Sequence, residues 1–198
     1  SILIVALSDI LEDLNVRTKA IQTKDGINVK VGFPQWVKPL LTLPAAIPLM
    51  VIRAGTTTMA LPFIGVLDFG ILYPLLIIPI GFVGASNLVN MLGGFNGLEA
   101  GMGVIYTLSL GLYAWKTGGI QAAVLFLTAC ATLLAFLRYN WYRAKILPGD
   151  SLTYLLGSLV AAGVIIGNMH RAGLTVMSPF IIEFVLKARS RFRASCIG

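Results

Sequence analysis

The chain contains six long stretches of apolar residues, separated by connections that carry most of its polar side chains. These stretches lie at about residues 37–52, 69–89, 102–115, 120–137, 151–167 and 174–186. Hydrophobic residues make up 57% of the chain and charged residues only 12%, whereas about a quarter of a soluble domain is charged. A helix needs roughly 20 predominantly apolar residues to cross the hydrocarbon core of a bilayer. The predicted fold is therefore all-α, a polytopic transmembrane helix bundle with about six full spans.

A seventh apolar run, SILIVAL at residues 1–7, opens the chain and is too short to cross a bilayer. The first residue is Ser1, and the run has neither the basic start nor the cleavage site of a signal peptide. We therefore expect residues 1–7 to be a truncated first helix and the chain to be a fragment. No internal repeat or soluble domain is visible, so residues 1–198 are predicted to form a single transmembrane domain.

The basic residues are distributed unevenly between the two sides of the predicted bundle. If the connections alternate between sides, all but three of the 15 Lys and Arg residues lie on one side, the exceptions being Arg53, Lys116 and Arg171. Basic connections tend to stay in the cytoplasm, so the richer side is predicted to be cytoplasmic. The net charge of +7 then indicates contact with lipid phosphates, and no nucleic-acid partner is expected.

One stretch on that predicted cytoplasmic side, NLVNMLGGFNGLEAG at residues 87–101, is unusually polar and rich in glycine for its position after an apolar run. Its glycines permit positive φ and let a flat ligand approach the backbone closely. Its asparagine amides supply both donors and acceptors. The simpler interpretation is a membrane helix that ends in an Asn-Gly turn. The residues concerned are Asn87, Asn90, Gly93, Gly94, Asn96 and Gly97.

An acidic pair, a further aspartate and a lysine fall on the same predicted side, and each of these three features has a simpler explanation. Asp9 and Glu12 are three residues apart and share a helix face, so they could hold Mg²⁺ or merely be solvated. Asp150, in a Pro-Gly-Asp sequence, could cap the helix that follows. Lys38 could bind phosphate or extend its ammonium group to the membrane surface. His170, the only histidine, is predicted on the opposite side and is assigned no catalytic role.

The motif at residues 87–101 resembles the cytoplasmic motif of the polyprenyl-phosphate N-acetylhexosamine-1-phosphate transferases. It is most similar to that of the UDP-GlcNAc:dolichyl-phosphate GlcNAc-1-phosphate transferases and their archaeal relatives. The runs KPLLTLPAAIPLM and YNWYRAKILPGDSLTYLLG fit the same family in order and spacing, so the resemblance covers nearly the whole chain. It implies a Mg²⁺-dependent enzyme, with Mn²⁺ as an alternative ion, that transfers a sugar 1-phosphate from a UDP-sugar to a polyprenyl phosphate and releases UMP.

The resemblance also implies roles for individual residues. Asn90 and Asp150 match the metal ligands, and Asp150 also counts among the catalytic residues. Asn96 matches the residue that reads the uracil edge, Gly94 the small residue beneath the ring, and Leu147 the residue on its other face. The remaining implied site residues are Lys38 near the phosphates, Asp9 as the second aspartate of a catalytic Asp-Asp pair, and Glu12 as a polar substrate-binding residue.

Two departures from the family pattern leave an alternative open. Ser8 stands where the family has the first aspartate of its pair, which is also compatible with an inactive paralogue or a membrane subunit of the same fold. The family's amino-terminal spans and the carboxyl-terminal part of its fold are absent from this chain, so the fragment alone is expected to be inactive. A third interpretation, a small transporter component, rests only on the prolines within the helices.

The implied partners and location follow from the same resemblance. The partners are a UDP-N-acetylhexosamine such as UDP-GlcNAc, a polyprenyl or dolichyl phosphate, the lipid bilayer and a second copy of the chain in a homodimer. The predicted location is the cell membrane of a prokaryote or archaeon, or the endoplasmic reticulum membrane of a eukaryote. In either membrane the active face would be cytoplasmic. Glu99, within the motif, has no assigned chemistry.

Overall fold

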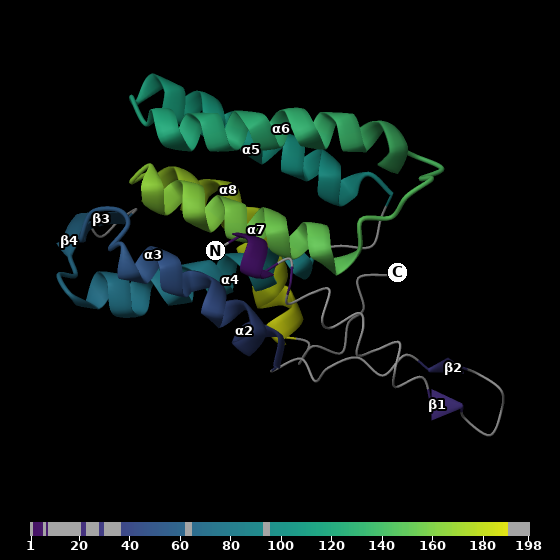
Figure 1. The fold of residues 1–198 in the computed structure, drawn as a ribbon, viewed down its shortest axis with the longest axis horizontal. Helices are drawn as coiled ribbons and strands as arrows, with labels where there is room; N and C mark the ends of the chain where they lie inside the picture. Colours follow the sequence, from purple (N-terminus) through teal and green to yellow (C-terminus); the bar gives the residue numbers. More distant parts are fainter. Residues whose placement is uncertain are drawn as a thin grey trace.

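The structure is a computed structural model that describes residues 2–5, 7, 21–22, 28–29, 37–61, 65–92 and 96–189. Helices account for nearly all of the described chain (Figure 1). They are α2 (Val37–Thr42), η1 (Leu43–Ala46), α3 (Ile47–Val51), η2 (Tyr73–Ile77), α4 (Ile78–Asn90), α5 (Leu98–Lys116), α6 (Ile120–Asn140), α7 (Gly149–Ile166) and α8 (His170–Arg189). Residues 2–5 and 7 are also helical.

Prolines explain why two of the predicted spans are irregular. Pro44 and Pro48 lie where α2 passes through the 3-10 turn η1 into α3, and Pro74 lies in the π-helical turn η2 before α4. A proline removes one backbone donor and clashes with the preceding turn, so the helix changes its pitch there. Each of the two segments nevertheless remains helical along its length, which gives six helical segments at the six predicted spans.

Three of these segments are long and apolar enough to cross a membrane: Tyr73–Asn90, Ile120–Asn140 and Gly149–Ile166. The prediction of an all-α membrane bundle is therefore confirmed, although the other segments do not meet the same standard. In α8 the sequence carries His170, Arg171, Glu183 and Lys187, which lowers its mean hydropathy. In α2, η1 and α3 the individual helices are short.

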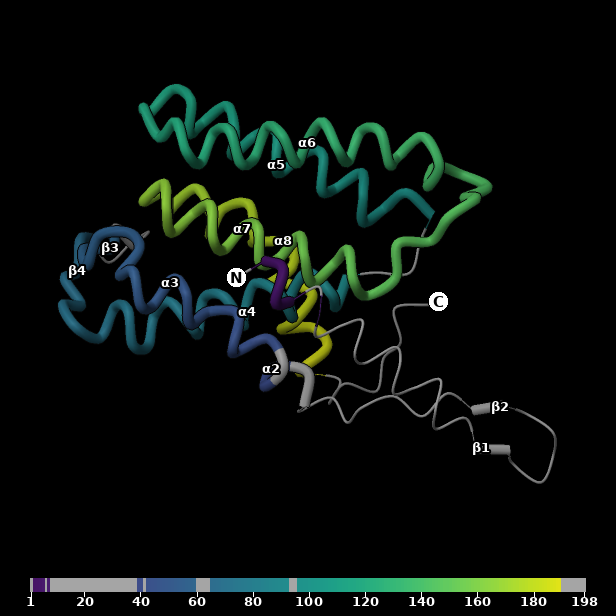
Figure 2. The backbone as a smooth tube through the Cα atoms, in the orientation of Figure 1, coloured from purple at the N-terminus to yellow at the C-terminus, as the bar shows by residue number. Residues whose placement is uncertain are grey.

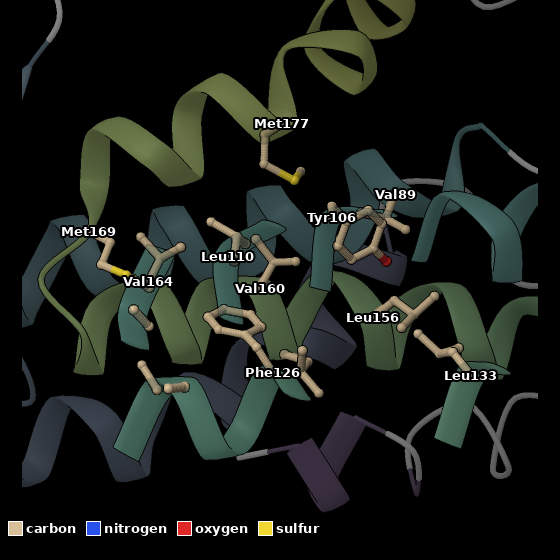
Figure 3. Packing of buried hydrophobic residues seen from close by; sticks show 14 of the residues in the cluster. Val89, Tyr106, Leu110, Phe126, Leu133, Leu156, Val160, Val164, Met169 and Met177 are labelled. Carbon is tan, nitrogen blue, oxygen red and sulfur yellow. The ribbon is translucent and has the colours of Figure 1, made fainter. Parts of the chain in front are cut away.

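The helix α7 lies at the centre of the bundle. In α7, 61% of the 18-residue apolar stretch is buried inside the protein, compared with 28% of the corresponding stretch in α6. One of its faces contributes Leu156, Val160 and Val164 to a core shared with α4, α5, α6 and α8, as Figure 3 shows in part. Another face contributes Tyr154 and Ile165 to a second core shared with α3 and α4. Helices α5 and α6 form an antiparallel hairpin on the outside of this arrangement (Figure 1).

A glycine in α7 sets how closely α4 and α7 approach. A Cβ atom at Gly157 would lie 2.4 Å from the carbonyl oxygen of Ala85 and 2.5 Å from Cα of Ser86. Such distances are far inside van der Waals contact, and both obstacles are backbone atoms that no rotamer change can move. The two helix backbones are therefore in contact at Gly157, four residues after Thr153 in α7, and at Ser86, four residues before Asn90 in α4.

Residues 53–68, predicted as a short connection, instead contain an antiparallel hairpin of β3 (Thr58–Leu61) and β4 (Gly65–Asp68). Asp68 accepts a hydrogen bond from the backbone N–H of Gly70 at 3.0 Å. This bond, together with the Thr57 hydroxyl, holds the pKa of Asp68 below its usual value. A second pair, β1 (Ile21–Gln22) with β2 (Asn28–Val29), lies within the first polar connection.

Candidate active site at the motif end of the bundle

The bundle has two ends of different character, which the backbone tube in Figure 2 separates clearly. At the hairpin end lie the β3–β4 hairpin, the turn between α5 and α6 and the turn between α7 and α8 (Figure 1). At the motif end α4 ends, α5 begins, α6 passes into α7 and α8 ends. The predicted alternation of connections between two sides is consistent with this path. The stretch 87–101 and the Pro-Gly-Asp sequence consequently share one end of the molecule.

Asn90 is the last residue of α4, and its side chain faces the first turn of α7. The Thr153 hydroxyl lies 2.6 Å from Oδ1 of Asn90 and 2.8 Å from the carbonyl oxygen of Asp150. It has one proton, so it donates to one of these oxygens at a time. Thr153 is only 2% exposed, whereas Asn90 is half-buried. The amide oxygen of Asn90 is therefore oriented towards α7 by a buried side chain.

Asp150 lies in the first turn of α7, three residues before Thr153, and is exposed. The N-cap of α7 is Pro148 and has no side-chain capping bond, so the interpretation of Asp150 as an N-cap is wrong. A carboxylate in the first turn is stabilised by the partial positive charge of the helix N-terminus. Asp150 thus places its carboxyl group at the protein surface, close in the fold to Asn90 although 60 residues separate them in the sequence.

The motif end includes a buried asparagine that the sequence analysis did not single out. Asn140, the last residue of α6, is 1% exposed. Its Oδ1 accepts a hydrogen bond from the N–H of Gly97 at 3.2 Å, and its Nδ2 donates to the carbonyl of Ile146 at 2.9 Å. The signal available in the sequence was an asparagine at the end of an apolar helix, because a buried amide there needs hydrogen-bond partners.

Asn140 thereby links the neighbours of two predicted uracil-binding residues. Asn96, which precedes Gly97, is exposed, and Leu147, which follows Ile146, is 70% exposed. Gly97 itself has φ of +77° at the start of α5, a conformation that favours glycine. The segments that carry Asn96 and Leu147 are therefore held together at the surface, with both side chains accessible.

A buried lysine from α8 reaches the same end. Nζ of Lys187 donates a hydrogen bond to the carbonyl of Met91, the residue after Asn90, and lies 3.4 Å from Oε1 of Glu183. Lys187 is 8% exposed. The sequence analysis treated Lys187 only as one of several bases near the end of the chain. A Glu-Lys pair four residues apart in an otherwise apolar helix was the signal that could have identified it.

Several predicted residues cannot be placed in this site. Asp9, Glu12 and Gly94 lie outside the described residues, as does Ser8. Lys38 lies in α2, which packs against α4, but its side chain is outside the described part. These roles therefore stay predictions.

Other polar residues have structural partners instead. Asn87, the first asparagine of the motif, donates to the carbonyl of Val83 in its own helix at 2.8 Å. His170 lies at the hairpin end, where its Nε2 is 2.7 Å from the hydroxyl of Tyr73. Its predicted separation from the motif end is confirmed.

The donor set at the motif end fits a hard divalent cation that needs few protein ligands. Asn90 and Asp150 offer an amide oxygen and a carboxylate, and Mg²⁺ is commonly bound by one or two carboxylates plus waters and substrate phosphates. In the described part of the chain, no group of three or more His, Cys, Asp and Glu side chains could hold a metal ion. An all-protein metal cage is thus absent from the described residues, whereas a site completed by a phosphate ligand is compatible with them.

Comparison with known proteins points to one family. Residues 1–168 match the family described as Glycosyl transferase family 4. A Sulfolobus acidocaldarius protein is 39% identical over 166 residues, which are 83% of this chain and 51% of that protein. Its provisional name is UDP-N-acetylglucosamine–dolichyl-phosphate N-acetylglucosaminephosphotransferase. This agreement confirms the resemblance identified from the motif at residues 87–101.

Two other relatives extend the comparison across lineages. The UDP-N-acetylglucosamine–dolichyl-phosphate N-acetylglucosaminephosphotransferase of Dictyostelium discoideum is 25% identical over 188 residues, 78% of this chain and 46% of that protein. The phospho-N-acetylmuramoyl-pentapeptide-transferase of Shouchella clausii is 37% identical over 116 residues, 59% of this chain and 35% of that protein. The chain spans about half the length of the first two curated relatives and about a third of this last one.

Proposed function

The chain belongs to glycosyl transferase family 4, and on that premise we propose that it forms the nucleotide-sugar and metal site of a phosphoglycosyl transferase. The donor is a UDP-N-acetylhexosamine, with UDP-GlcNAc favoured by the names of the relatives in Sulfolobus and Dictyostelium. The acceptor is a polyprenyl phosphate of the dolichyl type. The single observation that carries the proposal is the junction of Asn90, Thr153 and Asp150, where α4 and α7 meet.

The proposed reaction is a phosphoryl transfer that needs positioning and charge neutralisation more than covalent help from the protein. An oxygen of the polyprenyl phosphate attacks the phosphorus that bears the sugar. The bond from that phosphorus to the bridging oxygen breaks, and UMP leaves with that oxygen. The products are a polyprenyl diphosphate sugar and UMP. Asp9 would accept any proton that the attacking phosphate carries, and Lys38 would lie near the phosphates.

Asn90 and Asp150 would hold the divalent cation, Mg²⁺ or alternatively Mn²⁺, through one amide oxygen and one carboxylate oxygen. The bound cation would neutralise charge on the diphosphate. Thr153 orients the amide oxygen of Asn90 towards α7. Gly94, Asn96 and Leu147 would bind the uracil, and Asn140 holds the segments of the last two together through Gly97 and Ile146. Glu12 would contribute a further polar contact to the substrate.

We place the motif end in the cytoplasm, where UDP-sugars would enter. The distribution of the described basic residues supports this placement. Those at the motif end, in α6, α8 and the connection between α6 and α7, include Arg138, Arg143, Lys145 and Arg189. Those at the hairpin end are Arg53, Lys116 and Arg171. Excess Lys and Arg in short connections favours the cytoplasmic side. A site at the ends of membrane helices is accessible both to a soluble nucleotide sugar and to a lipid phosphate from the bilayer.

The proposal is tested with the complete protein in lipid nanodiscs, supplied with UDP-GlcNAc, dolichyl phosphate and Mg²⁺. We expect release of UMP in equal amounts with a dolichyl diphosphate sugar. Asn90→Ala or Asp150→Ala should abolish it, because each removes one oxygen ligand of the proposed metal site. Asp68→Ala, an equally exposed aspartate at the hairpin end, is the matched control and should retain activity. Unchanged turnover in both Asn90→Ala and Asp150→Ala would exclude this metal site.

A further inference from the structure

Lys187 occupies a position in α8 where an apolar residue would be expected. The buried residues of this helix are His170, Gly173, Met177, Phe180 and Lys187. Met177 and Phe180 belong to the apolar core, and Lys187 continues their inward-facing side about two turns beyond Phe180 along the helix. Burial of an ammonium group is costly unless the group is paired and hydrogen-bonded. The position of Lys187 therefore needs a specific reason.

The partners of Lys187 supply that reason, because they lie on α4 as well as on α8. Glu183, four residues earlier in α8, lies 3.4 Å away, and the carbonyl of Met91 accepts a hydrogen bond from Nζ. Met91 is the C-cap of α4 and directly follows Asn90. The last carbonyls of a helix have no partner within the helix and carry partial negative charge, so a cation there is stabilised.

Two helices thus hold the end of α4 by different means. From α7, Thr153 binds the side-chain amide of Asn90. From α8, Lys187 binds the backbone carbonyl of the next residue. A buried ion pair is weak evidence for a stabilising role, since apolar side chains of similar volume often stabilise equally well. An apolar side chain, however, could not donate a hydrogen bond to the Met91 carbonyl. It therefore could not restrain the direction of the backbone beside Asn90.

We propose that Lys187 is a positioning residue of the transferase, which fixes the last turn of α4 so that Asn90 presents its amide oxygen beside Asp150. Glu183 holds the Lys187 ammonium group in place for this contact. Without Lys187 the end of α4 frays, and Asn90 spends less time in the orientation that a cation requires. This inference rests on the proposed function for its catalytic consequence, but the restraint on α4 can be measured separately.

The test compares Lys187→Met with the matched control Lys145→Met, an exposed lysine at the same end of the bundle, in the complete protein in nanodiscs. Lys187→Met should speed hydrogen exchange of the backbone amides at 88–92, the last turn of α4 and its C-cap. It should also weaken Mn²⁺ binding measured by electron paramagnetic resonance, and raise the Mg²⁺ concentration for half-maximal activity, by about 10-fold. The KM for UDP-GlcNAc at saturating Mg²⁺ should change much less. Lys145→Met should match the wild type in each measurement.

Two further variants keep the test decisive if Lys187→Met does not fold. Lys187→Arg should recover part of the Mn²⁺ affinity, because a guanidinium group can donate to the same carbonyl, and Glu183→Gln should shift it in the same direction as Lys187→Met but less. Wild-type exchange at 88–92 and wild-type Mn²⁺ affinity in a folded Lys187 variant would overturn the inference. So would a loss of thermal stability without any change in Mn²⁺ affinity. If the wild type lacks transferase activity, the proposed function fails, whereas hydrogen exchange and Mn²⁺ binding still decide the role of Lys187.

Discussion

The two ends of the α4–α7 pair both contain asparagine, hydroxyl groups and a tight turn, yet they use these groups differently. At the hairpin end, the Tyr73 hydroxyl and the His170 ring are paired at 2.7 Å in a buried position. Asn168, with φ of +52°, accepts hydrogen bonds from the backbone N–H of Thr56 at 2.6 Å and from its hydroxyl at 3.0 Å. These polar groups hydrogen-bond to each other and so join segments that are distant in the chain.

At the motif end, buried polar side chains hold other polar groups that remain accessible. The Asn90 oxygen receives a bond from Thr153, and a carbonyl oxygen can accept a second interaction. Asp150 and Asn96 are exposed at the same end of the bundle. The exposed asparagine at the hairpin end, Asn168, accepts from both donors of Thr56, whereas the Asn90 oxygen shares a single hydroxyl donor with the Asp150 carbonyl. His170, which was assigned no catalytic role, has a buried tyrosine partner at the hairpin end.

The largest effect is expected from Gly157→Ala, which would break the contact on which both ends depend. The new methyl group would meet backbone atoms of Ala85 and Ser86, so α4 and α7 must move apart. Overpacking of this kind costs about 3 kcal/mol of the free energy of unfolding, measured by denaturation in mixed micelles. Activity should fall as well, because Thr153 would withdraw from Asn90.

Gly84→Ala is the matched control for that substitution. Gly84 also lies inside a helix, α4, but a Cβ atom there has no neighbour within 4 Å. Replacing a helical glycine with alanine generally stabilises by about 0.5–1 kcal/mol. Equal stability of the Gly157→Ala and Gly84→Ala proteins would contradict the close approach of the two helices.

Thr153→Val should impair the function of the motif end and leave the hairpin end intact. Valine keeps the shape of threonine but cannot donate to Asn90, so turnover should fall by about 10-fold, as for other residues that orient metal ligands. Stability should fall by only about 1 kcal/mol, the typical net value of a hydrogen bond. Thr128→Val, whose exposed hydroxyl bonds Val124 in its own helix, should leave turnover unchanged. A Thr153→Val protein with wild-type turnover would show that Asn90 needs no such orientation.

Tyr73→Phe should have the smallest effect and act only at the hairpin end. It leaves the buried His170 nitrogen without its tyrosine partner, which should lower the free energy of unfolding by about 1 kcal/mol. The Mg²⁺ dependence of turnover should not change, because His170 lies at the end opposite Asn90 and Asp150. The exposed Tyr113→Phe is the control for stability. A marked change in Mg²⁺ dependence would mean that the two ends are coupled through α4 and α7.

Much of the fold and part of the site could be predicted from the order of residues. Apolar runs located the six helical segments, because a membrane helix must be apolar along its length. The motif at 87–101 and Asp150 were recognised by residue type and spacing. Asn140, Thr153 and Lys187 were not singled out, because an asparagine, a threonine or a lysine near a helix end has many ordinary roles. Their importance depends on which residue of another helix they meet, as Lys187 meets Met91 across 96 positions.

Hydropathy and local turn chemistry act over neighbouring residues, so the order of residues was enough to predict a bundle of membrane helices with a polar motif between two of them. The motif at 87–101 also indicated the family, which the match over residues 1–168 confirms. The folded bundle was needed to learn that Gly157 brings α4 against α7, that Thr153 faces Asn90 and that Lys187 reaches the end of α4. These contacts depend on the packing of helices distant in the chain, and packing is set by the shapes of whole surfaces rather than by any local pattern.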